Sequence, residues 1–469
     1  MPGHGAVEMV EVAVVGAGLS GLVAARRLVQ RGVRSVLVLE ASDRVGGRVL
    51  NQRVDADTIV EAGGQFVGPG QDRVLALAGE LGVPTFPTYD RGRTVLVLGG
   101  RRHAFRALPY RFPLAMADFL RAAVRLGTAA RRVDPRRPWA APDAAALDAA
   151  TLADFVRRTT RTEPARNLFT LVSAVIFGGE PAEVSLLAAL AHIRSTGGLY
   201  RLLAVRGGAQ ERRLAGGSHE LALRMSAQLG DRVRLGRPVA GIERRDGGAR
   251  LLMPGGGVVS ARRVIVALAP ADRARIGFDP PLPEPVATAY RRAGSLSAVR
   301  VNAVYDRPFW REAGLNGQAL ADTGPAPLTF DNSPPDAHVG ILTTYLAGAT
   351  GTAGNRLAPT QRQLDDPEAR RDGVLDCLAG YFGERARRPV AYLEHDWRTE
   401  RFLSGCLPRT PPGLLTSAGP SLREHPGPIV WAGSEQAEAW DGFMDGAIRS
   451  GERAANLVAT QVSAGTGRG

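Results

Sequence analysis

The chain has 469 residues, 44% of them hydrophobic and 22% charged, which is typical of a globular protein with room for two domains. Its net charge is +13, and all 59 basic residues are arginine. The arginines lack an aromatic stacking pattern or a reading helix, so we expect no nucleic-acid partner. The start lacks a signal-peptide pattern, and no apolar run suits a bilayer. With only two cysteines, we expect a soluble, cytoplasmic, bacterial protein with no membrane partner.

The first pattern is a strand, a glycine turn, a helix and a second strand. Residues 12–15 and 36–39 are apolar runs typical of buried strands. Between them, a Gly-x-Gly-x-x-Gly turn opens a helical pattern. Its glycines permit a tight turn, close approach of a pyrophosphate and close packing of helix on strand, in that order. The turn therefore predicts a dinucleotide site formed by Gly16, Ala17, Gly18, Leu19, Ser20 and Gly21.

A carboxylate and a second glycine turn follow. Glu40 stands 19 residues beyond Gly21, where an acid can bind the ribose hydroxyls. The next residues, 41–48, combine paired glycines with arginines. Such a turn suits a cofactor that is held extended and buried, as FAD is, and the alternative is a solvated basic loop. We expect Ala41, Gly47 and Arg48 to contact the cofactor.

Later segments outline the rest of the fold. Residues 85–211 are rich in Ala, Arg and Leu, and we expect them to be helical. Strand-like pieces on either side of residues 246–248, an Asp-Gly-Gly sequence, predict a hairpin. Residues 263–268 predict a buried strand that rejoins the first sheet, and 429–433 predict a last one. A closing helix is expected from about residue 446 to 458.

From residue 10 to residue 458 the sequence resembles the flavin-containing monoamine oxidase family. Beyond the opening turn with Glu40, the resemblance is carried by Val45-Gly46-Gly47-Arg48, Gly63-Gly64-x-Phe66-Val67-Gly68-Pro69, Gly207-Gly208-Ala209-Gln210-Glu211-Arg212, Pro308-Phe309-Trp310, Trp397 with Cys406, and Ala432-Gly433-Ser434-Glu435 before Trp440-x-Gly442-Phe443-Met444. Each motif alone is modest. Their order and spacing make the resemblance specific.

The resemblance implies a mixed α/β fold in two parts. A Rossmann-like FAD-binding domain would be assembled from residues 1–84, 212–292 and 398–460. An inserted mixed-sheet and helical substrate domain would comprise 85–211 and 293–397, with 461–469 as a flexible tail. Monomer and homodimer both remain open.

The resemblance also implies oxidation of the C–N bond of a small-molecule amine. A hydride-equivalent would pass to the flavin, the imine would hydrolyse to an aldehyde or ketone, and O2 would become H2O2. We expect neither a catalytic triad nor a metal. His192 and His219 are interpreted as ordinary helix or surface residues, because no partner stands at a suitable spacing.

Two features of the family pattern, at three positions, are changed. The lysine that reaches the flavin through a water corresponds to Arg300, which keeps the charge but not the shape, and a salt-bridged strand residue is the alternative. The two aromatic rings that enclose the amine correspond to Leu407 and Phe443, so half of this cage is lost. The expected catalytic set is Arg300, Phe443, Leu407, Gln210 and Trp397.

The resemblance assigns the remaining cofactor contacts to Gly63, Gly64, Gln65, Phe66, Val239, Trp397, Cys406, Gly433, Ser434, Glu435, Phe443 and Met444. Cys406 stands where some members bond the flavin covalently, but Leu407 replaces the tyrosine that usually follows. A covalent bond and a small buried hydrophobe therefore remain equal alternatives for Cys406. Glu61 is either a base or a hydrogen-bond acceptor, and we favour the acceptor.

Other functions remain open. Arg300 and the altered cage are compatible with an oxidase of an amide or amino group of a specialised metabolite. An L-amino-acid oxidase is less favoured, because Gln65 and Phe66 follow the glycine pair without the arginine that binds a carboxylate in that relative. A flavoprotein without turnover is the hypothesis from another class.

Overall fold

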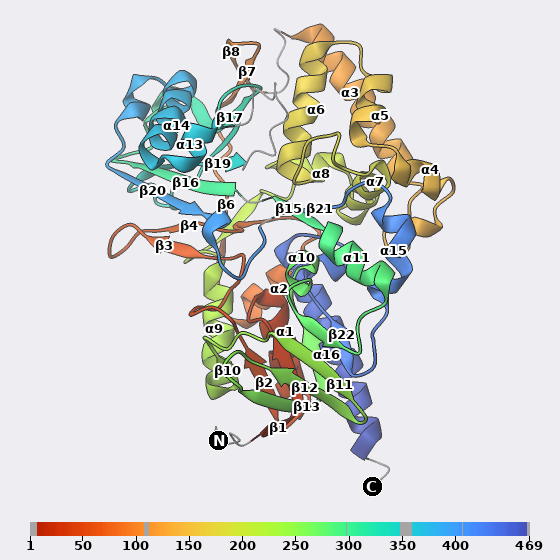
Figure 1. The fold of residues 1–469 in the computed structure, drawn as a ribbon. Coiled ribbons are helices and arrows are strands. Elements are labelled where there is room, and N and C mark those ends of the chain that lie inside the picture. The colour runs from red at the N-terminus through yellow and green to blue at the C-terminus, as the bar shows by residue number, and fades with distance from the viewer. Residues whose placement is uncertain (1–6, 107–111, 297, 348–358, 406, 467–469) are drawn as a thin grey trace.

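The computed structural model describes residues 7–106, 112–296, 298–347, 359–405 and 407–466. The molecule is elongated, with one large sheet at the end that holds the first strand and the last helix (Figure 1). A second sheet and a group of helices lie side by side at the other end (Figure 1). The mixed α/β fold agrees with the expected fold class.

The first sheet has the strand order β10-β2-β1-β13-β12-β11-β14, with β22 paired to β13. Its strands are β1 (Glu8–Val15), β2 (Val36–Leu39), β10 (Val233–Arg234), β11 (Gly241–Arg245), β12 (Gly248–Leu252), β13 (Val258–Val266), β14 (Gly277–Asp279) and β22 (Ile429–Trp431). Strand β13 runs parallel to both β1 and β22, and β11 and β12 form an antiparallel hairpin. The predicted hairpin and the predicted return of the chain to the first sheet are confirmed.

Both faces of strand β1 are buried. Val12 and Val14 pack in a core with helices α1 (Leu19–Gln30), α9 (His219–Leu229) and α16 (Met444–Thr466), together with α2 (Asp72–Glu80). Ala13 and Val15 pack in another core beneath the β11–β12 hairpin. This burial explains why the strand is a continuous apolar run. Helix α16 is longer than predicted, so residues 461–466, expected in a flexible tail, are helical.

The second sheet combines two distant parts of the chain, with the strand order β20-β16-β19-β18-β17-β7-β8. Its strands are β7 (Arg93–Leu98), β8 (Arg101–Phe105), β16 (Ala298–Tyr305), β17 (Leu315–Ala321), β18 (Leu328–Asp331), β19 (Gly340–Ala347) and β20 (Ala391–Asp396). Strand β7 pairs with β17 in parallel. Helix α14 (Pro367–Phe382) shares a core with this sheet. The strands β7 and β8 contradict the prediction that residues 85–211 are helical throughout.

The remainder of that segment is helical, as predicted. It forms α3 (Pro113–Ala130), α4 (Ala144–Ala149), α5 (Leu152–Thr159), α6 (Glu163–Ile176), α7 (Leu186–Ser195) and α8 (Leu199–Leu203), which enclose a core of their own. We call these six helices the helical lobe. Helices α11 (Glu284–Arg292) and α15 (Leu414–Arg423) pack on each other, with α15 also in contact with α4. Among the described helices, none combines the length and the hydropathy that a membrane span requires.

Short sheets join the two ends of the molecule. Strand β9 (Arg212–Leu214) lies between β5 (Phe66–Val67) and β6 (Thr85–Pro87), and β3 (Asn51–Arg53) pairs with β4 (Ile59–Glu61). Strand β15 (Gly294–Leu296) pairs with β21 (Leu407–Arg409). The division of the chain into domains stays a prediction.

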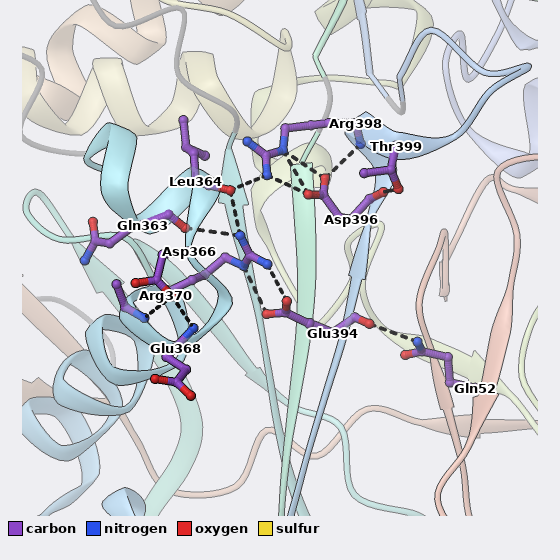
Figure 2. Close-up of polar contacts among 11 residues, drawn as sticks. Gln52, Gln363, Leu364, Asp366, Glu368, Arg370, Glu394, Asp396, Arg398 and Thr399 are labelled. Carbon is purple, nitrogen blue, oxygen red and sulfur yellow. Dashed lines mark hydrogen bonds and ion pairs between the residues drawn. The ribbon is translucent and has the colours of Figure 1, made fainter.

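Polar contacts fix the edge strand β20 (Figure 2). Arg370 of α14 donates to the main-chain oxygen of Leu364 at 2.7 Å and pairs with the Glu394 carboxylate of β20. Arg398 donates to the same oxygen at 2.6 Å. The main-chain oxygen of Glu394 in turn accepts from Gln52 of β3 at 3.0 Å. Since Leu364 belongs to helix α13 (Gln361–Asp365), these bonds hold β20 between α13 and β3.

Candidate active site

A cavity of about 710 Å3 extends from the first glycine turn to the helical lobe. The expected site residues that line it are Gly16, Gly18, Leu19, Ser20, Glu40, Ala41, Gly47, Arg48, Gly63, Gly64, Gln65, Phe66, Gln210, Val239, Trp397, Gly433, Ser434, Phe443 and Met444. Ala17, Gly21 and Glu435 stand next to this lining, not in it. Cys406 lies outside the described residues.

Glu40 ties the two glycine turns together. Its carboxylate accepts hydrogen bonds from the main-chain N–H of Ala17 at 2.6 Å and of Ser42 at 2.9 Å. The main-chain N–H of Gly46 donates to the oxygen of Ala17 at 2.9 Å, which sets the turns side by side. Helix α1 starts beyond Gly18, and no side chain caps it. The N–H groups of its first turn and the helix dipole are therefore available to an anion in the cavity.

The second and third glycines of the first turn differ in what surrounds them. A Cβ on Gly21 would stand 1.9 Å from the main-chain oxygen of Gly16, so this glycine is required by packing. A Cβ on Gly18 would meet only the oxygen of Gly46, at 4.0 Å. Because Gly18 lines the cavity, the space that its missing side chain leaves is open to a ligand. The turn thus fits the extended pyrophosphate of FAD.

Arg48 is held by the chain segment after β22. Its guanidinium pairs with Glu435 at 2.6 Å and donates to the Ser434 hydroxyl at 2.9 Å. Burial alone would raise the pKa of the Glu435 carboxyl, but the charge and hydrogen bond of Arg48 hold that pKa below its usual range. Glu435 therefore positions Arg48, and Arg48 lines the cavity.

Trp397 lines the middle of the cavity and is 3% exposed. Its indole N–H donates to the main-chain oxygen of Ala62 at 2.8 Å. The Asp396 carboxylate caps the turn that begins at Trp397 by accepting from the N–H of Arg398 at 2.9 Å. The cluster in Figure 2 includes both Asp396 and Arg398, so the bonds that fix β20 continue into the turn that begins at Trp397.

A chain of buried hydrogen bonds leads away from Arg300. The guanidinium of Arg300 donates to the Gln65 side-chain oxygen, and the Gln65 amide donates to Asn332 at 3.2 Å. The Asn332 amide donates to the Glu61 carboxylate at 3.4 Å, and Arg213 pairs with that carboxylate at 3.0 Å. The Gln65 oxygen thus accepts from the cation Arg300, the two amides bond to each other, and the Asn332 N–H donates to the anion Glu61. We call Arg300, Gln65, Asn332, Glu61 and Arg213 the polar chain.

Arg300 does not line the cavity itself, but two residues that it contacts do. It is 1% exposed, and its guanidinium lies 4.0 Å from the centre of the Tyr345 ring. Tyr345 and Gln65 both line the cavity, and Arg300 lies behind them. Glu61 is fully buried and accepts from two partners, which is the arrangement of an acceptor.

The expected half-cage contains a residue that was not predicted. Phe443 lines the cavity, and the ring of His192 stacks on it with the centroids 6.1 Å apart. His192 lies in helix α7, as interpreted, and it also lines the cavity, which was not predicted. Leu407 lies in strand β21, opposite Leu296. Gln210 is fixed by a hydrogen bond of 2.9 Å from its amide to the oxygen of Leu202.

His219, the other histidine considered, supports the second glycine turn. It is buried at the start of α9, and its Nε2 lies 2.9 Å from the main-chain oxygen of Val45. Burial lowers the pKa of His219, which favours the neutral ring. A Cβ on Gly46 would come within 2.7 Å of this ring, so the turn needs glycine there.

Comparison with known proteins decides the family. The profile described as flavin containing amine oxidoreductase matches residues 19–459. The chain belongs to this family.

Individual relatives agree with this assignment. A protein of Mycobacterium tuberculosis named as a flavin-containing monoamine oxidase, AofH, is 42% identical over 452 residues, 96% of either chain. An L-amino acid dehydrogenase of Synechocystis sp. is 36% identical, over 95% of this chain and 94% of that protein. The structure of cyclohexylamine oxidase from Brevibacterium oxydans superposes with a TM-score of 0.91 at 31% identity, covering 97% of this chain and 99% of that one. The chain is thus a flavin-dependent oxidoreductase that acts on amines.

Some residues of this amine oxidase site carry no local signal in the sequence. Tyr345, Asn332 and His192 stand in ordinary strand, loop and helix patterns. Tyr345 and His192 line one cavity with the glycine turns only because the second sheet and the helical lobe converge there. Asn332 is outside this lining and is connected to it by its hydrogen bond with Gln65. The weak available clue was Asn332, since a polar run after a strand often marks a site.

Proposed function

We propose that this amine oxidase acts on amines whose carbon next to nitrogen bears an apolar group. The observation that carries the proposal is the wall of the cavity beyond Phe443. It is formed by aliphatic and aromatic side chains, namely Leu171, Val172, Val175, Ile176, Leu202, Leu203, Leu320, Leu328 and Phe330. Burying a hydrocarbon group against such a wall contributes about 25 cal/mol per Å2.

The charges of the lining disfavour two other substrate classes. We call the end of the cavity near the glycine turns the nucleotide part and the end near Phe443 the amine part. The arginines of the lining stand in the nucleotide part, and they are Arg48, Arg237, Arg275 and Arg401. A substrate carboxylate would thus lack the partner that an amino-acid oxidase needs. Among the described lining residues, Asp441 supplies the carboxylate of the amine part, and an amide has no basic nitrogen to pair with it. A hydrophobic amine fits both features.

We further propose how the chain holds FAD. The N-terminus of α1 and Arg48 face the pyrophosphate, Glu40 accepts from the ribose hydroxyls, and the segment from Gly63 to Phe66 with Trp397 borders the isoalloxazine. When bound, the flavin accepts a hydride-equivalent from the carbon next to nitrogen and passes electrons to O2, giving H2O2. Arg300 contributes a fixed positive charge behind Gln65 that favours an anionic reduced flavin. The apolar wall excludes water from the reacting carbon.

A peroxide-release assay tests the substrate class. Purified protein with FAD is given hexylamine, benzylamine, putrescine, L-leucine and N-benzylacetamide. We expect H2O2 with hexylamine and benzylamine. For the other three we expect a kcat/KM at least about tenfold lower, because the apolar wall offers no partner for a second charged group and an amide nitrogen is too weakly basic to pair with Asp441. Preferred turnover of L-leucine or of the amide would refute the proposal.

The linkage of the flavin has its own test. Acid precipitation separates protein from unbound cofactor. Yellow colour in the pellet that disappears in Cys406→Ala would establish a thioether, and colour in the supernatant would establish a non-covalent cofactor.

A further inference from the structure

A second cavity adjoins the first one behind Phe443. Its volume is about 160 Å3, and it lies between the helical lobe and helices α11 and α15. Four residues line both cavities: Ile176, His192, Ala269 and Asp441. We call this shared border the neck. The second cavity thus continues the amine end of the main one.

The neck presents polar atoms that have no partner within the described part of the chain. His192 Nε2 and Asp441 Oδ1 are buried, and neither forms a hydrogen bond there. His192 Nδ1 lies 4.0 Å from the other carboxylate oxygen of Asp441. Burying an acceptor that receives no hydrogen bond is costly. A ligand that brings N–H groups to the neck would remove that cost.

The walls beyond the neck are mostly apolar. They include Phe177 and Val184 on the lobe side and Trp139, Tyr290 and Leu414 on the other. Three charged residues of the lining have partners: Arg409 pairs with Glu183 at 2.7 Å, Glu435 pairs with Arg48, and Arg423 donates to the main-chain oxygen of Pro135 at 3.5 Å. A cavity of about 150 Å3 with such walls holds one benzene ring. The volume and lining therefore suit a phenyl-sized group.

We propose that the second cavity binds the phenyl-sized N-substituent of a secondary amine. The nitrogen lies at the neck, where its N–H groups meet Asp441 and His192, and the arm to be oxidised lies in the main cavity beside Phe443. This inference rests on the proposed function, and it extends it from amines in general to secondary amines with two bulky arms.

The reaction balances without a further reactant. The substrate R–CH2–NH–R′ loses two electrons and two protons and becomes R–CH=N–R′. Water cleaves this imine to the aldehyde R–CHO and the primary amine that carries R′, while O2 takes up the two electrons and two protons as H2O2. The second cavity holds R′, which leaves as the amine.

Filling the second cavity tests the proposal with dibenzylamine and benzylamine as probes. Ala188 of α7 is half-buried and lines the second cavity but not the main one. Ala188→Leu suits a helix and occupies part of the cavity. We expect the ratio of kcat/KM for dibenzylamine to that for benzylamine to fall about tenfold or more. The matched control is Ala145→Leu on α4, where the side chain is exposed and lines neither cavity, and there the ratio is expected to stay.

The outcomes separate the two proposals. Absence of peroxide with both probes in the unaltered enzyme refutes the proposed function. Dibenzylamine binding is then read from its effect on Tm, and a binding shift that Ala188→Leu abolishes still supports the second cavity. Turnover of benzylamine with an unchanged ratio in Ala188→Leu overturns the inference. Ala191→Leu, which fills the same cavity from the next turn of α7, provides the same readout if the first variant does not fold.

Discussion

The nucleotide part and the amine part of the cavity are built by different means. Main-chain groups shape the first around the glycine turns. The N–H groups of Ala17 and Ser42 donate to Glu40 and that of Gly46 donates to Ala17, so the bonded residues all lie within residues 17–46. Side chains from helices and strands far apart in the chain shape the second, Phe443 and Tyr345 among them. Replacing a side chain can therefore change the amine that fits while the cofactor site stays intact.

The largest effects are expected in the first glycine turn, where Gly21 is required for packing and Gly18 leaves space for the ligand. Gly21→Ala places a methyl group 1.9 Å from the oxygen of Gly16, so we expect little folded protein. Gly18→Ala meets no atom closer than 4.0 Å and should fold with nearly unchanged Tm. Because its methyl group enters the pyrophosphate space, the Kd for FAD should rise about a hundredfold. Tm and flavin titration measure both, and unchanged FAD affinity in Gly18→Ala would contradict the assignment.

The next effect concerns the buried ion pair of the polar chain, formed by Arg213 and Glu61. Arg213→Met leaves the fully buried Glu61 carboxylate without its cation, so we expect the free energy of unfolding to fall by about 3–5 kcal/mol. Arg157→Met is the matched control, because it removes an exposed pair with Asp154 and should cost at most about 0.5 kcal/mol. Urea unfolding measures the difference. Equal losses of unfolding free energy in the two variants would mean that the buried pair of Arg213 and Glu61 stabilises the fold no more than an exposed pair does.

A smaller effect is expected at Arg300. Arg300→Met removes the positive charge behind Gln65, so reoxidation of the reduced flavin by O2 should slow about tenfold, more than anaerobic reduction by the amine. Arg300→Lys keeps the charge and should restore much of the rate. Stopped-flow measurement of both half-reactions decides, and equal slowing of the two would exclude a role in reoxidation.

The smallest effect is a pH dependence of the nucleotide part. Burial, with the charges of Arg453 and Arg273, lowers the pKa of His425 to about 4. The main-chain N–H of Trp431 donates to its Nδ1 at 3.4 Å, which requires the neutral ring. Between pH 6.5 and about 4 the unfolded chain binds a proton that the folded chain does not, so stability falls as the pH is lowered. In His425→Gln, Tm should fall less over this range, and an identical fall would contradict the assignment.

The same contrast explains what could be predicted from the sequence. The strand, turn, helix and acid around Gly18 and Glu40 are local, so spacing alone located them. The hairpin at residues 246–248 was equally local. Residues 93–105 form the hairpin β7–β8, whose Gly99-Gly100 turn was a local signal that the prediction overlooked. Only the pairing of β7 with β17, far along the chain, leaves no local mark in the sequence.

Site residues could likewise be predicted where they belong to a local motif and not where they depend on distant packing. The resemblance provided Trp397 and Phe443 because both belong to motifs. The cavity position of His192 was not predicted, because it depends on how α7 packs and leaves no spacing signal in the sequence. Arg300 was located by its distance from Trp310, but the sequence could not reveal that Gln65 and Tyr345 separate it from the cavity.

The parallel pairing of β7 with β17 has a consequence for biosynthesis. About 220 residues lie between Leu98 and Leu315, so β7 leaves the ribosome long before its neighbour exists. At about 5–20 residues per second, the β7–β8 hairpin waits for roughly 10–45 s with one edge unpaired. During that interval the unpaired edge of β7 is open to pairing with another chain, and slower translation lengthens this exposure.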